Sequence, residues 1–179
     1  LIQSTGSTMS LVADVQAANA LTLEAWIRPA NVTQDGPARI LSLSANPNER
    51  DFTLGEGLYD DRPSDVIDVR LRTTATDLNG VPSLTTPAGS LTAELTHVVY
   101  TRDANGLATI YLNGQPVSST QVDGSLGIWD ASYPLVLANE ATGDRPWLGE
   151  LYLVATYDRA LSADEVAQNF AAGPGHPVE

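Results

Sequence analysis

Oxygen-bearing side chains gather in the segment LANEATGDRPWLGEL, residues 137–151. Asn139, Glu140 and Asp144 lie within it, and calcium takes roughly six to eight oxygen ligands from carboxylates, amides and carbonyls. The segment SANPNERD offers a second set of such side chains, namely Asn46, Glu49 and Asp51. We therefore expect a calcium site at a rim where the two loops meet. The alternative is that Asp144 pairs with Arg145 or caps its own turn, while Glu140 is solvated.

Aromatic and ionic side chains alternate along the segment LTLEAWIRP, where Glu24, Trp26 and Arg28 share one face of an extended chain. Carbohydrate recognition needs an aromatic surface beside planar hydrogen-bonding groups. The segment DVIDVRLRT offers a further ionic face with Asp68, Arg70 and Arg72. We expect these six residues to line a concave sheet that binds a glycan, with Tyr111 or Tyr152 nearby.

Trp26 also has a structural alternative, in which a long loop covers the ring and Glu24 joins a salt-bridge network beneath it. Trp129 and Trp147 lie in loop segments and are the other candidate aromatic surfaces. The tripeptide that ends in Trp147 is more typical of a plug at the end of a sandwich.

The charge of the chain excludes several classes of partner. Its 179 residues include nine Arg, no Lys and 22 acids, for a formal net charge of −13. Such a field repels phosphate backbones and attracts divalent cations, so nucleic acid and anionic membranes are poor partners. No apolar run reaches the roughly 18 residues that a membrane span needs. There is no cysteine, which excludes disulfides and thiolate chemistry.

The elements that must position these residues are mostly strands. Apolar and polar residues alternate in LTLEAWIRP and DVIDVRLRT, and ARILSLS, DFTLGEG, YPLVLANE and WLGELYLVATYD are further strand segments. Asn105-Gly106 and Asn113-Gly114 predict tight hairpin turns, because Asn and Gly tolerate positive φ. We therefore expect an all-β fold, a two-sheet antiparallel jelly-roll sandwich.

One short helix is predicted, in LSADEVAQNFAAG near the C-terminus. Ser162 and Glu165 have the spacing of a capping box, Leu161 and Val166 that of a hydrophobic staple, and Gly173 ends the segment. We expect residues 1–173 to form one domain and residues 174–179 to be a tail or linker.

The segments LTLEAWIRP, LTHVVYTRDANGLATIYLNGQPV, LANEATGDRPWLGEL and YDRALSADEV, in this order, resemble the bacterial laminin-G-like branch of the concanavalin A-like lectin/glucanase superfamily. The resemblance covers roughly residues 21–173. It implies the jelly-roll fold and a rim loop that binds calcium. Such domains usually begin with a strand upstream of the first residue here, so we expect an upstream segment or another chain to donate a strand to the open edge.

Catalysis is not expected. Glucanases of this superfamily carry a Glu-x-Asp-x-Glu pattern on one strand, which aims its carboxylates into the cleft, and the chain has no such triplet. The acids of LYDDRPSDVIDV, namely Asp60, Asp61, Asp65 and Asp68, do not place three carboxylates on one strand face. His97 and His176, the two histidines, form no triad with a serine that the sequence singles out.

The sequence and the resemblance together predict a noncatalytic, calcium-binding adhesion or carbohydrate-binding module of a larger secreted bacterial protein. Its expected location is extracellular or at the cell surface, and its expected partner is a glycan or a cell-surface protein. The alternative function is that of a structural or protein-interaction module without glycan binding. The start of the chain lacks a signal-peptide pattern, which favours a mature fragment or an excised domain.

Overall fold

The computed structural model describes residues 2–4, 6–60 and 62–175. His176 and most of the predicted tail therefore lie outside the described residues. The described elements in chain order are β1 (Ile2–Gln3), α1 (Met9–Ala18), β2 (Leu21–Pro29), β3 (Ala38–Asn46), β4 (Glu49–Glu56), β5 (Ile67–Leu71), β6 (Leu84–Thr85), β7 (Thr96–Arg102), β8 (Leu107–Leu112), β9 (Gln115–Gln121), β10 (Leu135–Leu137), β11 (Gly149–Tyr157) and α2 (Ala163–Ala172).

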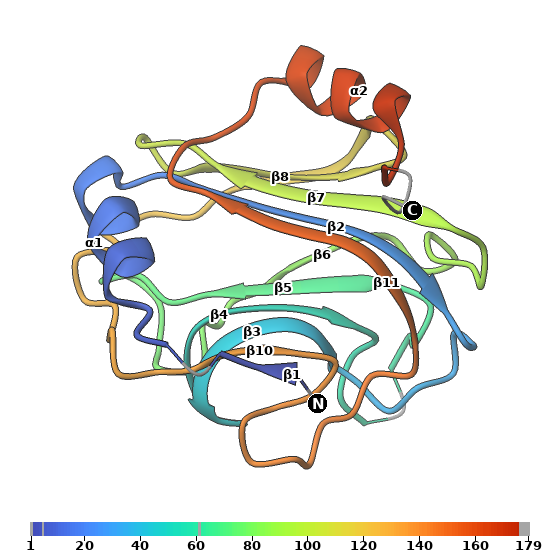
Figure 1. The fold of residues 1–179 in the computed structure, drawn as a ribbon, viewed down its shortest axis with the longest axis horizontal. Coiled ribbons are helices and arrows are strands. Elements are labelled where there is room, and N and C mark those ends of the chain that lie inside the picture. Colours follow the sequence, from blue (N-terminus) through green and yellow to red (C-terminus); the bar gives the residue numbers. More distant parts are fainter. Residues whose placement is uncertain (1, 5, 61, 176–179) are drawn as a thin grey trace.

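The strands form two antiparallel sheets that pack face to face (Figure 1). The six-stranded sheet has the order β1-β10-β3-β4-β5-β6, and the five-stranded sheet has the order β11-β2-β7-β8-β9. This confirms the predicted antiparallel jelly-roll sandwich. No helix of the described residues is long and apolar enough to cross a membrane.

The core lies between the sheets and consists mainly of the apolar side chains that alternate with outward-facing residues along the strands. On β2, Leu21, Leu23, Ala25 and Ile27 are fully buried in it. Since successive side chains of a strand point to opposite faces, every second residue of β2 faces away from this core. Glu24 and Trp26 are nevertheless buried as well, because α2 covers the outer face of the five-stranded sheet (Figure 1).

The predicted turns and the predicted helix are confirmed. At the β8–β9 turn, Asn113 has a φ of 51° and Gly114 a φ of 77°, the left-handed conformations that a tight hairpin requires. The backbone N–H of Glu165 donates to the Ser162 hydroxyl, and the Glu165 carboxylate accepts from the Ser162 N–H, so the capping box at the start of α2 is complete.

The expectation of a single helix is wrong, because α1 precedes β2. Its N-cap residue, Thr8, makes no capping bond with its side chain, and its first turn carries no acid, so the start signals that marked α2 are missing here. Val12 and Val15 anchor α1 to the core. Packing rather than capping therefore specifies this helix.

The short strand β1 pairs with β10, with Ile2 opposite Leu137. The chain's own N-terminal residues thus add a strand to this edge of the six-stranded sheet. Donation of a strand by another chain or by an upstream segment stays a prediction.

Candidate functional site

The predicted aromatic platform is covered. The Trp26 ring stacks on His97, with ring centroids 4.8 Å apart, and on Phe170 of α2, with centroids 5.7 Å apart. Only 6% of Trp26 is exposed. The expectation of an exposed ring beside a polar groove is therefore wrong, and the structural alternative describes Trp26 better, with a helix in place of the loop.

Glu24 lies beneath the same helix and ties it to the sheet. Its carboxylate accepts hydrogen bonds from Tyr157 Oη at 2.7 Å and Asn169 Nδ2 at 3.0 Å, and it contacts His97 Nε2 at 2.8 Å. Burial acts to raise the pKa of Glu24, but the interactions with His97, Tyr157 and Asn169 outweigh it and hold this pKa below its usual value. Glu24 is thus an ionised internal anchor for α2.

Arg28 is the exposed member of the β2 set. Its guanidinium lies 3.4 Å from the Glu150 carboxylate and 5.7 Å from the centre of the Tyr152 ring. The predicted proximity of Tyr152 to this strand is confirmed. The three residues form an ionic and aromatic patch on the surface, separate from Trp26.

The second half of the predicted glycan face lies in the other sheet. β2 pairs with β11 and β7, whereas Asp68 and Arg70 belong to β5 of the six-stranded sheet and Arg72 follows it. The prediction that all six residues line one face is therefore wrong. The alternation that placed each set on one face of its own strand does not reveal which strands become neighbours.

The outer face of the six-stranded sheet carries a pocket of about 410 Å³ that is rich in arginine. Residues that line it include Arg39, Arg62, Arg70, Arg145, Tyr59 and Asn79. We call it the arginine pocket. It holds four of the nine arginines of a protein whose net charge is −13, and none of its lining residues is acidic. Such a concentration of guanidinium groups suits a carboxylate or another anion.

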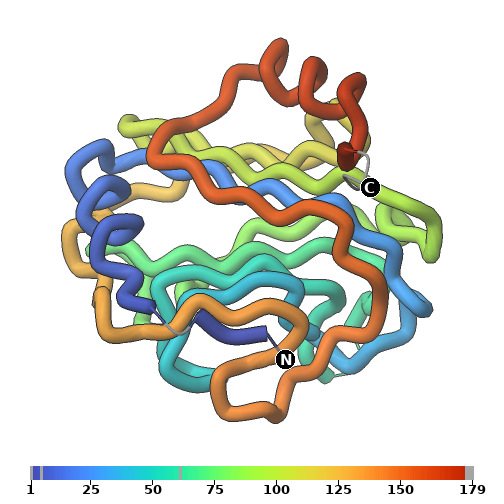
Figure 2. Tube along the Cα trace, viewed as in Figure 1, coloured from blue at the N-terminus to red at the C-terminus, as the bar shows by residue number. Residues whose placement is uncertain are grey.

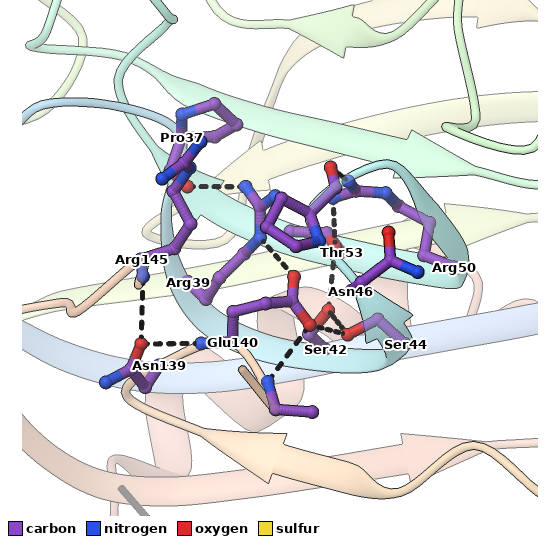
Figure 3. Close-up of polar contacts among 12 residues, drawn as sticks. Pro37, Arg39, Ser42, Ser44, Asn46, Arg50, Thr53, Asn139, Glu140 and Arg145 are labelled. Carbon is purple, nitrogen blue, oxygen red and sulfur yellow. Dashed lines mark hydrogen bonds and ion pairs between the residues drawn. The ribbon is translucent and has the colours of Figure 1, made fainter. Parts of the chain in front are cut away.

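At the base of the arginine pocket, Arg39 forms an ion pair with Glu140, as Figure 3 shows. Arg39 Nε donates to Glu140 Oε2 at 3.0 Å, and both side chains are buried almost completely. The other oxygen of Glu140 accepts hydrogen bonds from the Ser44 hydroxyl and the Ala141 N–H. Glu140 thereby fixes the position of Arg39 at the base of the pocket.

A second buried guanidinium adds to the positive charge. Arg50 Nη1 donates to Thr53 Oγ1 at 2.9 Å (Figure 3). Arg50 Nη2 donates to the Pro47 carbonyl. Burial lowers the pKa of Arg50 to about 9, and the positive charges of Arg39 and Arg70 act in the same direction. An anion in the pocket would relieve this repulsion.

Arg70 and Tyr59 form part of the pocket wall. Arg70 Nε lies 3.1 Å from Asp68 Oδ2, and its Nη1 donates to Asn79 Oδ1 at 2.9 Å. Asp68 also accepts from Thr85 Oγ1 at 2.8 Å, so its carboxylate is a buried support for Arg70. Tyr59 is 57% exposed and offers an aromatic surface beside the arginines.

The residues of the predicted calcium site have other partners. Glu140 pairs with Arg39, whereas Asn139 accepts from the backbone N–H groups of Glu140 and Arg145. Asp144 accepts from the Thr142 hydroxyl at 2.6 Å and lies 3.5 Å from Arg145.

The other predicted ligands have partners outside this loop or serve local turns. Glu49 accepts from Tyr133 Oη, Asp51 accepts from the Asp130 N–H, and Asn46 accepts from the Asn48 N–H. Within residues 2–4, 6–60 and 62–175, no three His, Cys, Asp or Glu side chains form a group that could hold a metal ion. The geometry thus does not fit the shared site expected from the sequence, and calcium binding stays a prediction.

Sequence reasoning included Arg70 among the ligand-binding residues but missed Arg39, Arg62, Arg145 and Tyr59. One signal was present, since the tripeptide Asp-Arg-Pro occurs twice and contains Arg62 and Arg145. The four missed residues come from three segments that are distant in the sequence. No local sequence pattern indicates that these segments lie together in the fold.

The fold defines a lectin-like jelly-roll sandwich with an open, arginine-rich outer face. Residues 3–167 match the family of that architecture, and the chain belongs to the concanavalin A-like lectin/glucanases superfamily. No curated protein matches the chain.

Similar solved structures include carbohydrate-binding modules. The CBM40 module of the Ruminococcus gnavus IT-sialidase, bound to α2,3-sialyllactose, is 18% identical with a TM-score of 0.65, and the match covers 94% of this chain and 92% of that one. A candidate carbohydrate-binding protein from Bacteroides ovatus is 20% identical with a TM-score of 0.62, over 86% of this chain and 41% of that one. The NanB sialidase of Streptococcus pneumoniae is 18% identical with a TM-score of 0.64, and the match covers 92% of this chain and 26% of that one. The chain thus spans less than half of the last two proteins, and these likenesses show the fold.

Proposed function

We propose that this chain is a noncatalytic carbohydrate-binding module and that its ligand carries an acidic group, which binds in the arginine pocket. The observation that carries the proposal is the gathering of Arg39, Arg62, Arg70 and Arg145 around one hollow of a strongly acidic protein. Guanidinium groups bind carboxylates through paired hydrogen bonds. Tyr59 supplies the aromatic surface that the apolar face of a sugar ring requires.

Two further features support a sugar rather than a free inorganic anion. The pocket volume of about 410 Å³ falls within the range of ordinary small-molecule sites. Asn48 and Asn79 line it beside the arginines, and amide groups both donate to and accept from hydroxyl groups. The structural likeness to a module bound to sialyllactose is consistent with this ligand class.

We place the module in a larger secreted bacterial protein, outside the cell or at its surface, where it would bind the protein to a glycan. Such a role requires affinity without catalysis, in keeping with the missing carboxylate triplet. Calcium has no part in the proposed contact.

Isothermal titration with sialyllactose, an acid-terminated trisaccharide, and with lactose, its neutral part, tests the proposal. We expect binding of sialyllactose and none of lactose at the same concentrations. The double substitution Arg62→Gln and Arg145→Gln should weaken binding at least tenfold, since it removes two cations from the pocket. The matched control is Arg28→Gln with Arg159→Gln, which removes the same charge from exposed ion pairs elsewhere.

The titrations also distinguish the proposed function from a net-charge effect and from a structural or protein-interaction module. Equal loss of affinity in both double variants would assign the effect to net charge and contradict the pocket. If a panel of sialic-acid and uronic-acid oligosaccharides gives no binding, the structural or protein-interaction module becomes the better description.

A further inference from the structure

The arginine pocket continues into two further hollows on the same surface. It shares Tyr59 and Arg62 with a hollow of about 390 Å³. That hollow in turn shares Thr33 and Asp35 with a third, of about 450 Å³, and Arg145 connects the third to the arginine pocket. We call the second and third hollows together the extension.

Three loops build the extension. The segment after β2, the segment between β4 and β5, and the segment before β11 contribute its lining residues. Figure 2 shows these segments gathered at the end of the sandwich away from α1. Their supports are buried: Gln34 donates to Glu56 Oε2 at 3.0 Å, and Trp147 Nε1 donates to the same oxygen at 2.7 Å. The extension therefore has a fixed base.

The sign of the charge changes along the groove. Four arginines and no acid line the arginine pocket, whereas Asp35, Asp60 and Asp144 line the extension together with Arg62 and Arg145, which it shares with the pocket. A carboxylate is therefore attracted at one end of the groove and repelled at the other. The electrostatic field along the groove therefore orients a ligand that has one acidic end, with that end in the arginine pocket.

The extension also offers surfaces for neutral sugar rings. Tyr59 lies at the border between the arginine pocket and the extension, since it lines both. Pro146 and Leu148 line the far hollow, and Leu148 is 57% exposed. Apolar surface beside Asn31, Thr33 and carboxylate oxygens provides both kinds of contact that a neutral hexose makes, to its ring face and to its hydroxyls.

We infer that the extension is a second carbohydrate subsite, which binds neutral sugar residues attached to the acidic residue in the arginine pocket. This inference rests on the proposed function, because it takes the arginine pocket as the site of the acid. It specifies the ligand class further: an oligosaccharide with a single acidic end is preferred over a chain that carries an acid on every residue.

Titration with three probes tests the second subsite: free sialic acid, sialyllactose and a linear trimer of sialic acid. We expect sialyllactose to bind about tenfold more tightly than free sialic acid, because its two neutral sugars contact the extension. The trimer should bind more weakly than sialyllactose, because the acids of the extension repel its additional carboxylates.

The variant Asp35→Asn isolates the charge of the extension, and Asp14→Asn on the exposed face of α1 is the matched control. Asp35→Asn should raise the affinity for the trimer at least threefold and change that for free sialic acid less than twofold. Equal affinities of free sialic acid and sialyllactose would overturn the second subsite while the proposed function stands. Failure of all three probes and of the uronic-acid oligosaccharides to bind would remove the proposed function, and the inference with it.

Discussion

Arg39 and Glu140 form an ion pair of 3.0 Å in which the side chains are 1% and 0% exposed. The pair joins β3 to the loop that follows β10, residues that are 101 positions apart in the sequence. Burial of both charges is costly unless their remaining atoms are hydrogen-bonded. Here Ser44, the Ala141 N–H and the Pro37 carbonyl satisfy most of them, so the pair positions the base of the arginine pocket.

Glu140→Gln should therefore destabilise the fold. Removal of one partner leaves the Arg39 charge buried without its counter-ion, which costs about 3 kcal/mol of the free energy of unfolding. Urea denaturation followed by fluorescence measures the change. The control is Asp144→Asn in the same loop, whose side chain is 49% exposed and whose loss should change the stability by about 0.5 kcal/mol or less. Equal effects of the two variants would contradict the anchoring role of Glu140.

Trp26→Ala separates a structural tryptophan from a glycan platform. The ring is packed between the sheet and α2, so its removal should cost about 3 kcal/mol or more of stability. The affinity for sialyllactose, measured at a temperature where the variant is folded, should stay within twofold of the original value. A variant that melts normally but no longer binds glycan would restore Trp26 as a ligand contact.

The pH dependence of stability should change in Glu56→Gln. Burial raises the pKa of Glu56 to about 7, against the hydrogen bonds from Trp147 and Gln34. The folded state thus binds a proton that the unfolded state releases, and the contribution of this group to stability falls as the pH rises from about 4.5 to 7.

Gln keeps an oxygen acceptor for both donors without the charge. The variant should therefore be as stable as the original protein near pH 4.5 and more stable at pH 8, by roughly 2 kcal/mol. Chemical denaturation of both proteins across this range measures the difference. A constant difference at every pH would show that the pKa of Glu56 is the same in the folded and unfolded states.

Calcium remains a prediction from the sequence, and thermal melting tests it. An ion that binds only the native state raises the melting temperature as its concentration exceeds its dissociation constant. Under this prediction, calcium added to chelator-treated protein raises the melting temperature, and Asp144→Asn removes the shift. An unchanged melting curve would remove calcium from the description of this loop.

Local features of the fold could be predicted from the sequence because their causes are local. The Asn113-Gly114 turn depends on positive φ, and the capping box of Ser162 and Glu165 depends on bonds within one helical turn. The helix α1 could not be predicted in this way, since Val12 and Val15 gain their stability from a core assembled by distant strands.

The candidate site shows the same limit. Asp68 and Arg70 lie on one face of β5, as the alternation predicts. Their neighbours on that face include Thr53 of β4 and Thr85 of β6, and none of them comes from β2. Trp26 was placed on the correct face of its strand, yet the sequence did not reveal that α2 lies over it.

The charge of the arginine pocket itself does not depend on pH in the physiological range. No lining residue is a histidine or a carboxylic acid, and arginine stays protonated throughout the neutral range. For an acid that contacts the arginine pocket alone, any loss of affinity on acidification should therefore follow the titration of the ligand's own carboxyl group. Under the proposed function, the chain would retain an acidic glycan in mildly acidic surroundings, where a histidine-based site would change its charge.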